Sequence, residues 1–373
     1  VPIERESALV LTKRFLALAF EKRDPYFNNI KSDLKAVLDS FFEVIGEPNT
    51  KYERIVRADA VMETYLDSSL NSQIFRDSFY GLLDIGISKT QLDIQKIAEQ
   101  GLYYVQGVMA LSLFKIRKRS MQGRSAELDF VIKMFKADLF CGTRRLESWI
   151  LLGQSYSFLV EDDLIWTSDK LNSDRKNNTA ISQKRAILCY LMAVSIYAQM
   201  TDEQKENSKR MIALLWTLLS KGMYSSSMQP MGKLCYQLST TPKLLLSASG
   251  YSETHSEKPI VDTSIYRTNL LSFRMAIKLS DDDWSNYYYA ANLQVKLDSK
   301  PESAIKILLR SCESAKNQHG SSSEPTIEPH YRLCSLVYKY VKGKRIDINT
   351  GLRYLKQDND FTSIKSLKKL KTL

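Results

Sequence analysis

The chain has 373 residues, of which 44% are hydrophobic, and it contains only 14 glycines and 9 prolines. This length exceeds what one hydrophobic core usually holds, so we expect several domains or an extended stack of helices. The shortage of glycine and proline, which interrupt helices, favours the stack. No apolar run approaches the roughly 18 residues that a membrane span requires. The sequence opens without a methionine and directly in a helical pattern, so we expect a piece of a longer polypeptide.

The net charge of +11 is concentrated at one end of the chain. Residues 331–373 contain eleven lysines and arginines against three aspartates, whereas residues 1–330 are nearly neutral. Such a basic end is typical of segments that contact nucleic acid, an acidic protein surface or a transport receptor. The five cysteines are widely spaced and form no metal-binding or redox motif, so we expect them to be reduced and buried.

Residues 1–125 are expected to form an N-terminal helical segment. Its last helix includes Tyr103-Tyr-Val-Gln106-Gly107-Val-Met-Ala110, a weak form of a repeat signature that recurs further along the chain. Cations at the end of a helix complement its exposed carbonyl groups, which explains some of the basic residues there but not five in ten positions. This basic cluster is a candidate nucleic-acid contact and consists of Lys115, Arg117, Lys118, Arg119 and Arg124.

Residues 126–250 are expected to form central helical repeats. Trp149-Ile-Leu-Leu152-Gly153-Gln-Ser-Tyr156 matches the W-x2-L-G-x2-Y signature of a tetratricopeptide first helix at every specified position. Helical spacing places Trp149, Leu152 and Tyr156 on one face, where they fill the space against a partner helix. Gly153 then allows the two helices to approach closely. The flanking apolar residues also recur at helical spacing, and no run alternates with period two, so almost no β-sheet is expected.

Polar stretches predict the loops that separate these helices. The best candidate for a domain boundary is the stretch with Gly250, His255 and Pro259. The sequence therefore predicts three parts, 1–125, 126–250 and 260–373. The four predicted loops are Ser120–Ser125, Thr167–Asn178, Ser247–Asp262 and Lys316–Glu328.

Residues 260–373 are expected to form C-terminal repeats followed by a basic tail. Ser280 with Asp283, and Ser299 with Glu302, have the spacing of a capping box and predict two helix starts. Weaker copies of the signature begin at Trp284 and Tyr331. The steps between copies are uneven, so we predict an all-α, irregular tetratricopeptide-like solenoid. The tail is either a short basic amphipathic helix or a solvated terminus, and its cations are Lys365, Lys368, Lys369 and Lys371.

No pattern in the sequence indicates catalysis. His255 and His319 lie in polar stretches without a nearby cysteine, and His330 begins a helix beside Pro329. No phosphate-binding loop, dinucleotide fingerprint or nucleophile turn occurs. We therefore expect a binding protein with no catalytic residues, cofactor, metal or small-molecule substrate.

Three segments resemble the large scaffold subunit of the HIR histone-chaperone complex, whose animal relative is the calcineurin-binding protein cabin. They are Arg145–Leu171, the helix pair that begins at Trp284, and Ile327–Tyr340. The resemblance implies a nuclear, non-enzymatic scaffold that holds WD-repeat subunits and serves nucleosome assembly independently of replication. Histones are strongly basic, so a chain of net charge +11 fits them poorly. We expect contacts with a sister subunit or with DNA, and indirect contact with histones.

The first helix of each tetratricopeptide pair lines the concave side of the repeat. The pattern carried over from Trp149, Trp284 and Tyr331 predicts a partner-binding groove for an extended peptide. The alternative function is a basic helical module that binds duplex or nucleosomal DNA through the basic cluster and tail, with an affinity that falls as salt rises. The predicted groove residues are Glu147, Gln154, Ser285, Asn286, Tyr289, Asn292, Arg332 and Lys339.

Overall fold

The structure is a computed structural model in which the helices form two compact units. Unit 1 comprises Val1–Thr201 and Met228–Pro259, and unit 2 comprises Asp202–Ser227 and Ile260–Leu373. No helix among the described residues is long and apolar enough to cross a membrane. The residues that the structure describes are 4–21, 24–28, 30–48, 52–87, 93–119, 126–167, 173–237, 245–247, 250–252, 260–298, 300–318 and 326–357.

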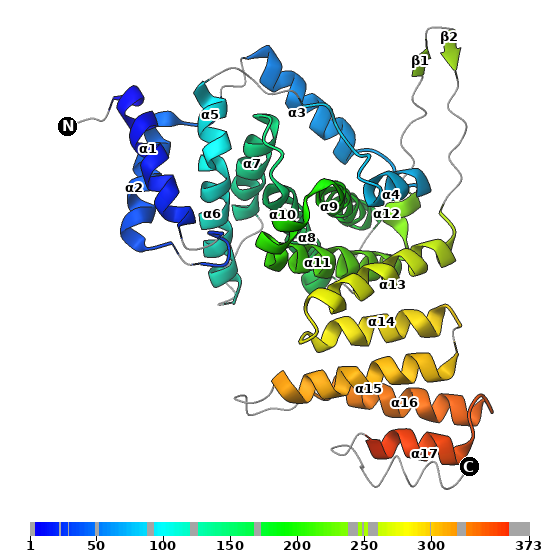
Figure 1. Ribbon diagram of the computed structural model, residues 1–373. Helices are drawn as coiled ribbons and strands as arrows, with labels where there is room; N and C mark the ends of the chain where they lie inside the picture. Colours follow the sequence, from blue (N-terminus) through cyan, green and yellow to red (C-terminus); the bar gives the residue numbers. More distant parts are fainter. Residues whose placement is uncertain are drawn as a thin grey trace. The chain divides into compact units, whose positions relative to one another are not determined.

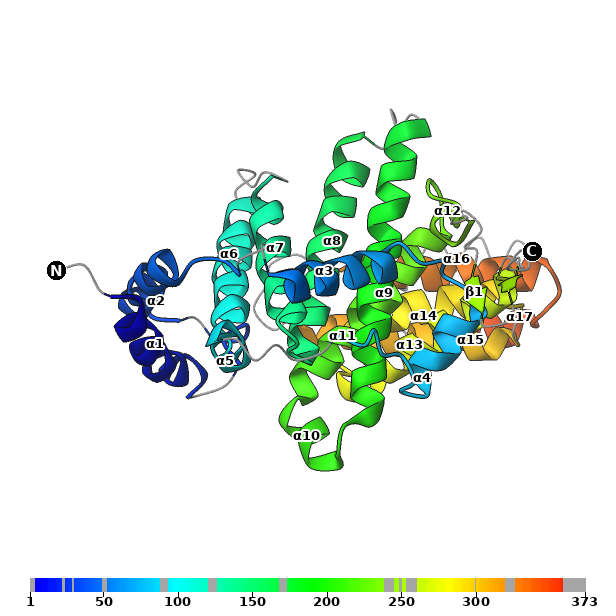
Figure 2. The ribbon, with the colours of Figure 1, turned by 90° about the horizontal axis from the view of Figure 1, so that it is seen from above.

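Unit 1 is built mainly from helices that pack against their neighbours in sequence. Helices α6 and α7 lie side by side, as do α8 and α9, and both pairs are visible in Figure 2. Its helices are α1 (Arg5–Phe20), α2 (Ser32–Ile45), α3 (Glu53–Leu66), α4 (Ser72–Phe79), α5 (Asp93–Gln100), α6 (Leu102–Arg119), α7 (Glu127–Phe140), α8 (Leu146–Thr167), α9 (Ser173–Gln199) and α12 (Leu234–Gln237).

The predicted helical fold class is confirmed, with one small addition. Strands β1 (Leu245–Ser247) and β2 (Gly250–Ser252) pair antiparallel, with Ser247 opposite Gly250. This hairpin was not predicted, because three-residue strands are too short to show an alternating pattern. Helix α9 also begins earlier than predicted, since residues 173–178 of the predicted loop at 167–178 are helical and Thr167 belongs to α8. Residues 168–172 lie outside the described residues.

The two helix pairs of unit 1 use glycine in the same way. In α8, a Cβ added at Gly153 would lie 2.5 Å from Cε1 of Tyr190 in α9. In α6, a Cβ added at Gly107 would lie 2.7 Å from Cε1 of Phe135 in α7. Both rings have no exposed surface. The weak signature at Tyr103 and the full match at Trp149 therefore mark equivalent helices, each with a glycine against an aromatic ring of the next helix.

Replacing Gly153 by alanine should destabilise unit 1 by about 1–3 kcal/mol, because the buried Tyr190 ring has no room to move aside. At an open helix position, replacing glycine by alanine stabilises by up to about 1 kcal/mol. A loss of stability at Gly153 would therefore show that the added methyl group collides with the Tyr190 ring. Urea denaturation of Gly153→Ala measures it. In a double-mutant cycle, Gly153→Ala with Tyr190→Leu should cost less than the sum of the single changes, and strict additivity would contradict the explanation.

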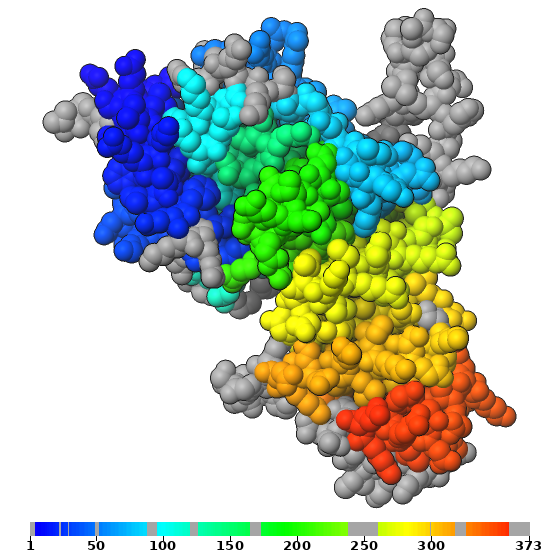
Figure 3. Space-filling model, viewed as in Figure 1, coloured from blue at the N-terminus to red at the C-terminus, as the bar shows by residue number. Residues whose placement is uncertain are grey.

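Unit 2 is a stack of helices in which each contacts the next. In Figure 1, α13 to α17 lie in successive layers, and Figure 3 shows adjoining bands of side chains along the same stack. Its helices are α10 (Asp202–Asn207), α11 (Lys209–Ser227), α13 (Asp262–Leu279), α14 (Trp284–Lys296), α15 (Pro301–Gln318), α16 (Glu328–Lys342) and α17 (Ile348–Gln357).

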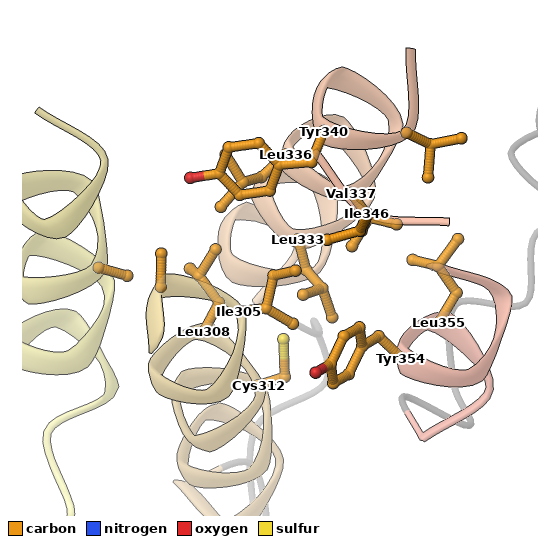
Figure 4. Packing of buried hydrophobic residues seen from close by; sticks show 13 residues of the cluster. Ile305, Leu308, Cys312, Leu333, Leu336, Val337, Tyr340, Ile346, Tyr354 and Leu355 are labelled. Carbon is orange, nitrogen blue, oxygen red and sulfur yellow. The ribbon is translucent and has the colours of Figure 1, made fainter. Parts of the chain in front are cut away.

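A continuous core joins the last helices of this stack. Figure 4 shows Ile305 and Leu308 of α15 meeting Leu333 and Val337 of α16, with the ring of Tyr354 pointing from α17 into the same core. All five are at most 7% exposed. Each helix alone would leave this apolar stripe in water, so the stack is stable because every helix covers its neighbour.

The start of α14 differs from the prediction. The capping box was expected to begin the helix at Ser280, but α14 begins at Trp284 and its N-cap is Asp283. The Asp283 carboxylate accepts a hydrogen bond from the Ser285 amide at 3.0 Å and pairs with Lys221 of α11 at 3.1 Å. The N-cap of α14 therefore lies at Asp283, three residues after Ser280, because Asp283 binds both a free backbone amide and a lysine. Lys221 is too distant in sequence for a local pattern to include it.

Candidate protein-binding site

In unit 1, the face predicted to bind a peptide is occupied by the chain's own segment Asp24–Asn28. The Tyr26 hydroxyl donates a hydrogen bond to Oε1 of Gln154 in α8, at 3.0 Å. Nζ of Lys115 in α6 donates to the Tyr26 hydroxyl at 2.6 Å and to Gln154 at 3.0 Å. It also lies 4.1 Å from the centre of the Tyr26 ring. Gln154 is therefore 7% exposed and already has a partner.

The same segment brings a carboxylate to the polar interior of unit 1. Asp24 accepts a hydrogen bond from the Tyr104 hydroxyl at 2.6 Å. Burial raises the pKa of Asp24, and the Tyr104 hydrogen bond and the nearby Arg145 reduce that rise. Glu147, a predicted groove residue, is half-buried next to Asp24 and Arg145, and burial raises the pKa of its carboxyl group. Glu147 thus belongs to an internal acid–arginine cluster.

The basic cluster at the end of α6 is largely paired inside unit 1. Arg117 forms an ion pair with Glu127 at 3.2 Å, and Lys118 pairs with Glu161 at 2.7 Å. Lys118 also lies 4.6 Å from the centre of the Phe158 ring. Arg119 is exposed, whereas Arg124 and the tail lysines Lys365, Lys368, Lys369 and Lys371 lie outside the described residues.

Lys115 should titrate unlike an exposed lysine. Burial, with a smaller contribution from Arg119, lowers the pKa of Lys115 from 10.5 to about 8. Between these pH values the unfolded chain holds a proton that the folded chain has lost, so the Lys115 contribution to unfolding free energy rises with pH. We expect an increase of about 3 kcal/mol across this window, since each pKa unit corresponds to about 1.4 kcal/mol.

Urea denaturation of the native chain and of Lys115→Met at pH 7 and pH 10 measures this change. The native chain should gain stability relative to Lys115→Met as the pH rises. A stability difference that is the same at both pH values would show that Lys115 keeps its proton in the folded chain.

In unit 2, the predicted groove residues divide into buried and accessible groups. Asn286 has no exposed surface, and its Nδ2 lies 3.5 Å from Oγ1 of Thr217 in α11. Ser285 is half-buried and donates through its hydroxyl to the capping Asp283 at 2.6 Å. Lys339 is exposed on α16. A peptide on this face would therefore meet residues other than Asn286.

Of the remaining three predicted groove residues, Asn292 and Arg332 join α14 to α16, and Tyr289 of α14 packs against α11. Nε of Arg332 donates a hydrogen bond to Oδ1 of Asn292 at 2.7 Å, and the Asn292 side chain lies beside Tyr224 of α11. Asn292 is 6% exposed. The Tyr289 ring packs on Tyr224 with their centroids 4.6 Å apart. Residues from three helices thus form one polar and aromatic row. The sequence predicted Tyr289, Asn292 and Arg332 for this face, but not Tyr224.

Two important residues of these faces were not identified from the sequence. Tyr26 lies outside every repeat copy, and no local pattern indicates that it packs against α6 and α8. Tyr224 is one of 20 tyrosines, and only the contacts between α11 and α14 distinguish it. Among the described residues, no group of three or more histidine, cysteine, aspartate or glutamate side chains is placed to hold a metal ion.

Comparisons with known proteins match most of the chain. The family model described as the HIR3 helical bundle domain matches residues 22–280, and that described as the HIR3 TPR domain matches residues 303–372. The full signature at Trp149 therefore falls within the helical-bundle match. The weaker copy at Tyr331 falls within the TPR match, which includes α16 and α17.

Curated relatives cover the chain almost completely. A histone transcription regulator 3 homolog of Debaryomyces hansenii is 39% identical over 92% of the chain. Homologs with the same name from Candida albicans and Eremothecium gossypii are 38% and 33% identical over 92% and 96% of the chain. The chain spans only 19%, 22% and 23% of the length of these three relatives.

Proposed function

This chain belongs to the HIR3 family, and we propose that it is a non-enzymatic scaffold module of a nuclear histone-chaperone complex that assembles nucleosomes independently of replication. The proposal is supported by the name histone transcription regulator 3, which the relatives carry. The observation that carries it is the helix stack of unit 2, in which α16 leaves Tyr331 and Lys339 exposed, because such faces bind partners in helical-repeat proteins.

The partners that we propose are the WD-repeat subunits of the complex. A net charge of +11 opposes direct binding of basic histones, so histones would be held by other subunits. Nothing in this function requires a cofactor or a small-molecule substrate. The three-part division into 1–125, 126–250 and 260–373 stays a prediction, and limited proteolysis checks it by cleavage near residues 125 and 250–260.

Co-purification tests the scaffold role. The chain is immobilised and exposed to the purified WD-repeat subunits at physiological salt, with an unrelated basic helical-repeat protein as control bait. We expect retention of at least one WD-repeat subunit by the chain and not by the control. Failure to retain any of these subunits would contradict the proposal.

The DNA-binding alternative has less support in the described residues. Phosphate binding needs available cations, whereas Arg117 and Lys118 pair with glutamates and Lys115 is hydrogen-bonded inside unit 1. A gel shift at two salt concentrations, with charge reversal at Lys368, Lys369 and Lys371, examines the tail separately.

A further inference from the structure

Helix α16 has two faces of different chemistry. One face carries Leu333, Leu336, Val337 and Tyr340, which lie in the core shared with α15 and α17 (Figure 4). The other face carries side chains that are exposed from one end of the helix to the other. We call these exposed residues the α16 stripe, and they are Ile327, Tyr331, Ser335, Lys339 and Lys342.

The first part of the α16 stripe is apolar. Tyr331 is 69% exposed and Ile327 is 51% exposed. They are four residues apart and so lie on the same side of the chain as it enters the helix. Large apolar side chains that remain in water next to polar residues are typical of surfaces that a partner covers.

Arg332 lies at the edge of the α16 stripe and is held in place from behind. Its Nε donates to Oδ1 of Asn292 at 2.7 Å, and Asn292 is itself fixed by burial and by Tyr224. No hydrogen bond or ion pair among the described residues uses the two terminal nitrogens of Arg332. A guanidinium group oriented by its Nε presents those nitrogens as a pair, which is the geometry that a carboxylate binds.

The other cations of the stripe are also without an acidic partner in the described part of the chain. None of the ion pairs there includes Lys339 or Lys342. Two acids of unit 2 pair with other cations, Asp283 with Lys221 and Asp298 with Arg345. Glu328 is the one acid on the exposed side of α16, and it lies in the first helical turn, where it complements the helix dipole.

We propose that the α16 stripe and Arg332 bind an extended acidic segment of a partner protein, with one carboxylate on Arg332, a second on Lys339 and an apolar side chain on Tyr331. This inference rests on the proposed scaffold function and names the partner chemistry of one surface. Seven residues of helix separate the two cations by about 10 Å. A partner segment in the polyproline II conformation rises about 3.1 Å per residue and presents every third side chain on the same side, so two acids three positions apart can meet both cations.

Unit 1 shows that this chain already uses such chemistry. There, Asp24 and Tyr26 of a short irregular segment lie against α6 and α8, and they are recognised by Tyr104, Gln154 and Lys115. An aspartate and a nearby tyrosine thus provide hydrogen-bond partners for polar side chains on two helices of this chain. The α16 stripe has the same classes of side chain and lacks an occupant among the described residues.

Peptide binding to the whole chain tests the proposal. The probe is a fluorescent peptide of about 12 residues with two glutamates three positions apart and a leucine next to them, before the glutamates in one version and after them in another. Anisotropy should show saturable binding of at least one version. Replacing both glutamates by glutamine should lower the affinity about tenfold or more, because each charge-assisted hydrogen bond contributes over 1 kcal/mol.

Variants locate the site on the chain. Lys339→Gln should weaken binding severalfold, and Arg332→Gln about tenfold, with circular dichroism confirming that both remain folded. Lys339 is exposed, so its variant stays informative even if Arg332→Gln unfolds. The matched control is Lys306→Gln, an exposed lysine on α15, which should leave the affinity unchanged.

Three outcomes would overturn the proposal. They are equal binding of the glutamate and glutamine peptides, affinity unaffected by Lys339→Gln and Arg332→Gln, and displacement of the peptide by an equimolar amount of a short DNA duplex. The last result would indicate a general anion surface. If the chain retains WD-repeat subunits but does not bind the acidic peptide, the scaffold function stands and only this site is contradicted. If the chain binds the peptide but retains no WD-repeat subunit, the site stands and the scaffold function is contradicted.

Discussion

Asp138→Ala should lower the free energy of unfolding of unit 1 by about 3–5 kcal/mol, because it leaves a buried arginine without its counter-charge. Asp138 has no exposed surface, and its Oδ2 accepts hydrogen bonds from Arg145 Nε at 3.1 Å and Ser148 Oγ at 2.6 Å. The Arg145 side chain is 18% exposed. A mostly buried guanidinium group that loses the carboxylate bonded to it bears a desolvation cost that the nearby Glu147 and Asp24 offset only in part.

The loss should be largest around α5. Arg145 also donates to the backbone carbonyl groups of Ala98 and Glu99, both at 3.1 Å, and so ties α5 to the turn between α7 and α8. Urea denaturation measures the global effect, and hydrogen exchange of residues 93–100 measures the local one. Asp129→Ala, an exposed aspartate on the same helix, is the control and should change stability by less than about 0.5 kcal/mol. A similar effect of both variants would show that Asp138 matters only as a surface charge.

Trp149→Ala should cost about 3–5 kcal/mol, the range for removing a buried tryptophan from a core. Trp149 is 3% exposed, and its ring meets Tyr65 of α3 edge to face with centroids 6.0 Å apart. Tyr65 in turn donates to the backbone carbonyl of Leu188 in α9, at 2.7 Å. Loss of the indole therefore leaves a cavity among three helices.

Chemical denaturation followed by circular dichroism checks this value, and Trp149→Phe should recover part of the loss. The matched control is Tyr80→Ala, which removes an aromatic ring that is 74% exposed and should cost less than about 0.5 kcal/mol. If Trp149→Ala were as mild as Tyr80→Ala, the repeat signature would not describe the packing of α8.

The residues of the repeat signature were placed correctly from the sequence alone. Trp149, Leu152 and Tyr156 are buried on one face of α8, and Gly153 meets the next helix. The five cysteines carry no disulfide, and all but the half-buried Cys334 are buried as expected. These predictions succeeded because helical periodicity relates residues three or four apart, which a single sequence shows directly.

The polar residues were harder to place. Gln154 and Asn292 were expected to line an open groove, and the structure gives them partners from other segments, Tyr26 and Arg332. Lys115 was grouped with exposed cations, but it turns inward to Tyr26. A polar side chain on the predicted face of a helix can meet solvent, another helix or an irregular segment, and helical spacing is the same in each case.

For this protein, the amino-acid sequence by itself determined that the chain is helical, that its helices pair, and that aromatic residues and glycines form the contacts within pairs. Tertiary structure alone decided which polar faces remain accessible, because Tyr26 and Gln154 meet across 128 residues of sequence. Local spacing carries the hydrophobic stripe of each helix, whereas hydrogen bonds between distant segments depend on the path of the whole chain. That path covers the polar face of α8 in unit 1 and leaves the terminal nitrogens of Arg332 in unit 2 without a partner among the described residues.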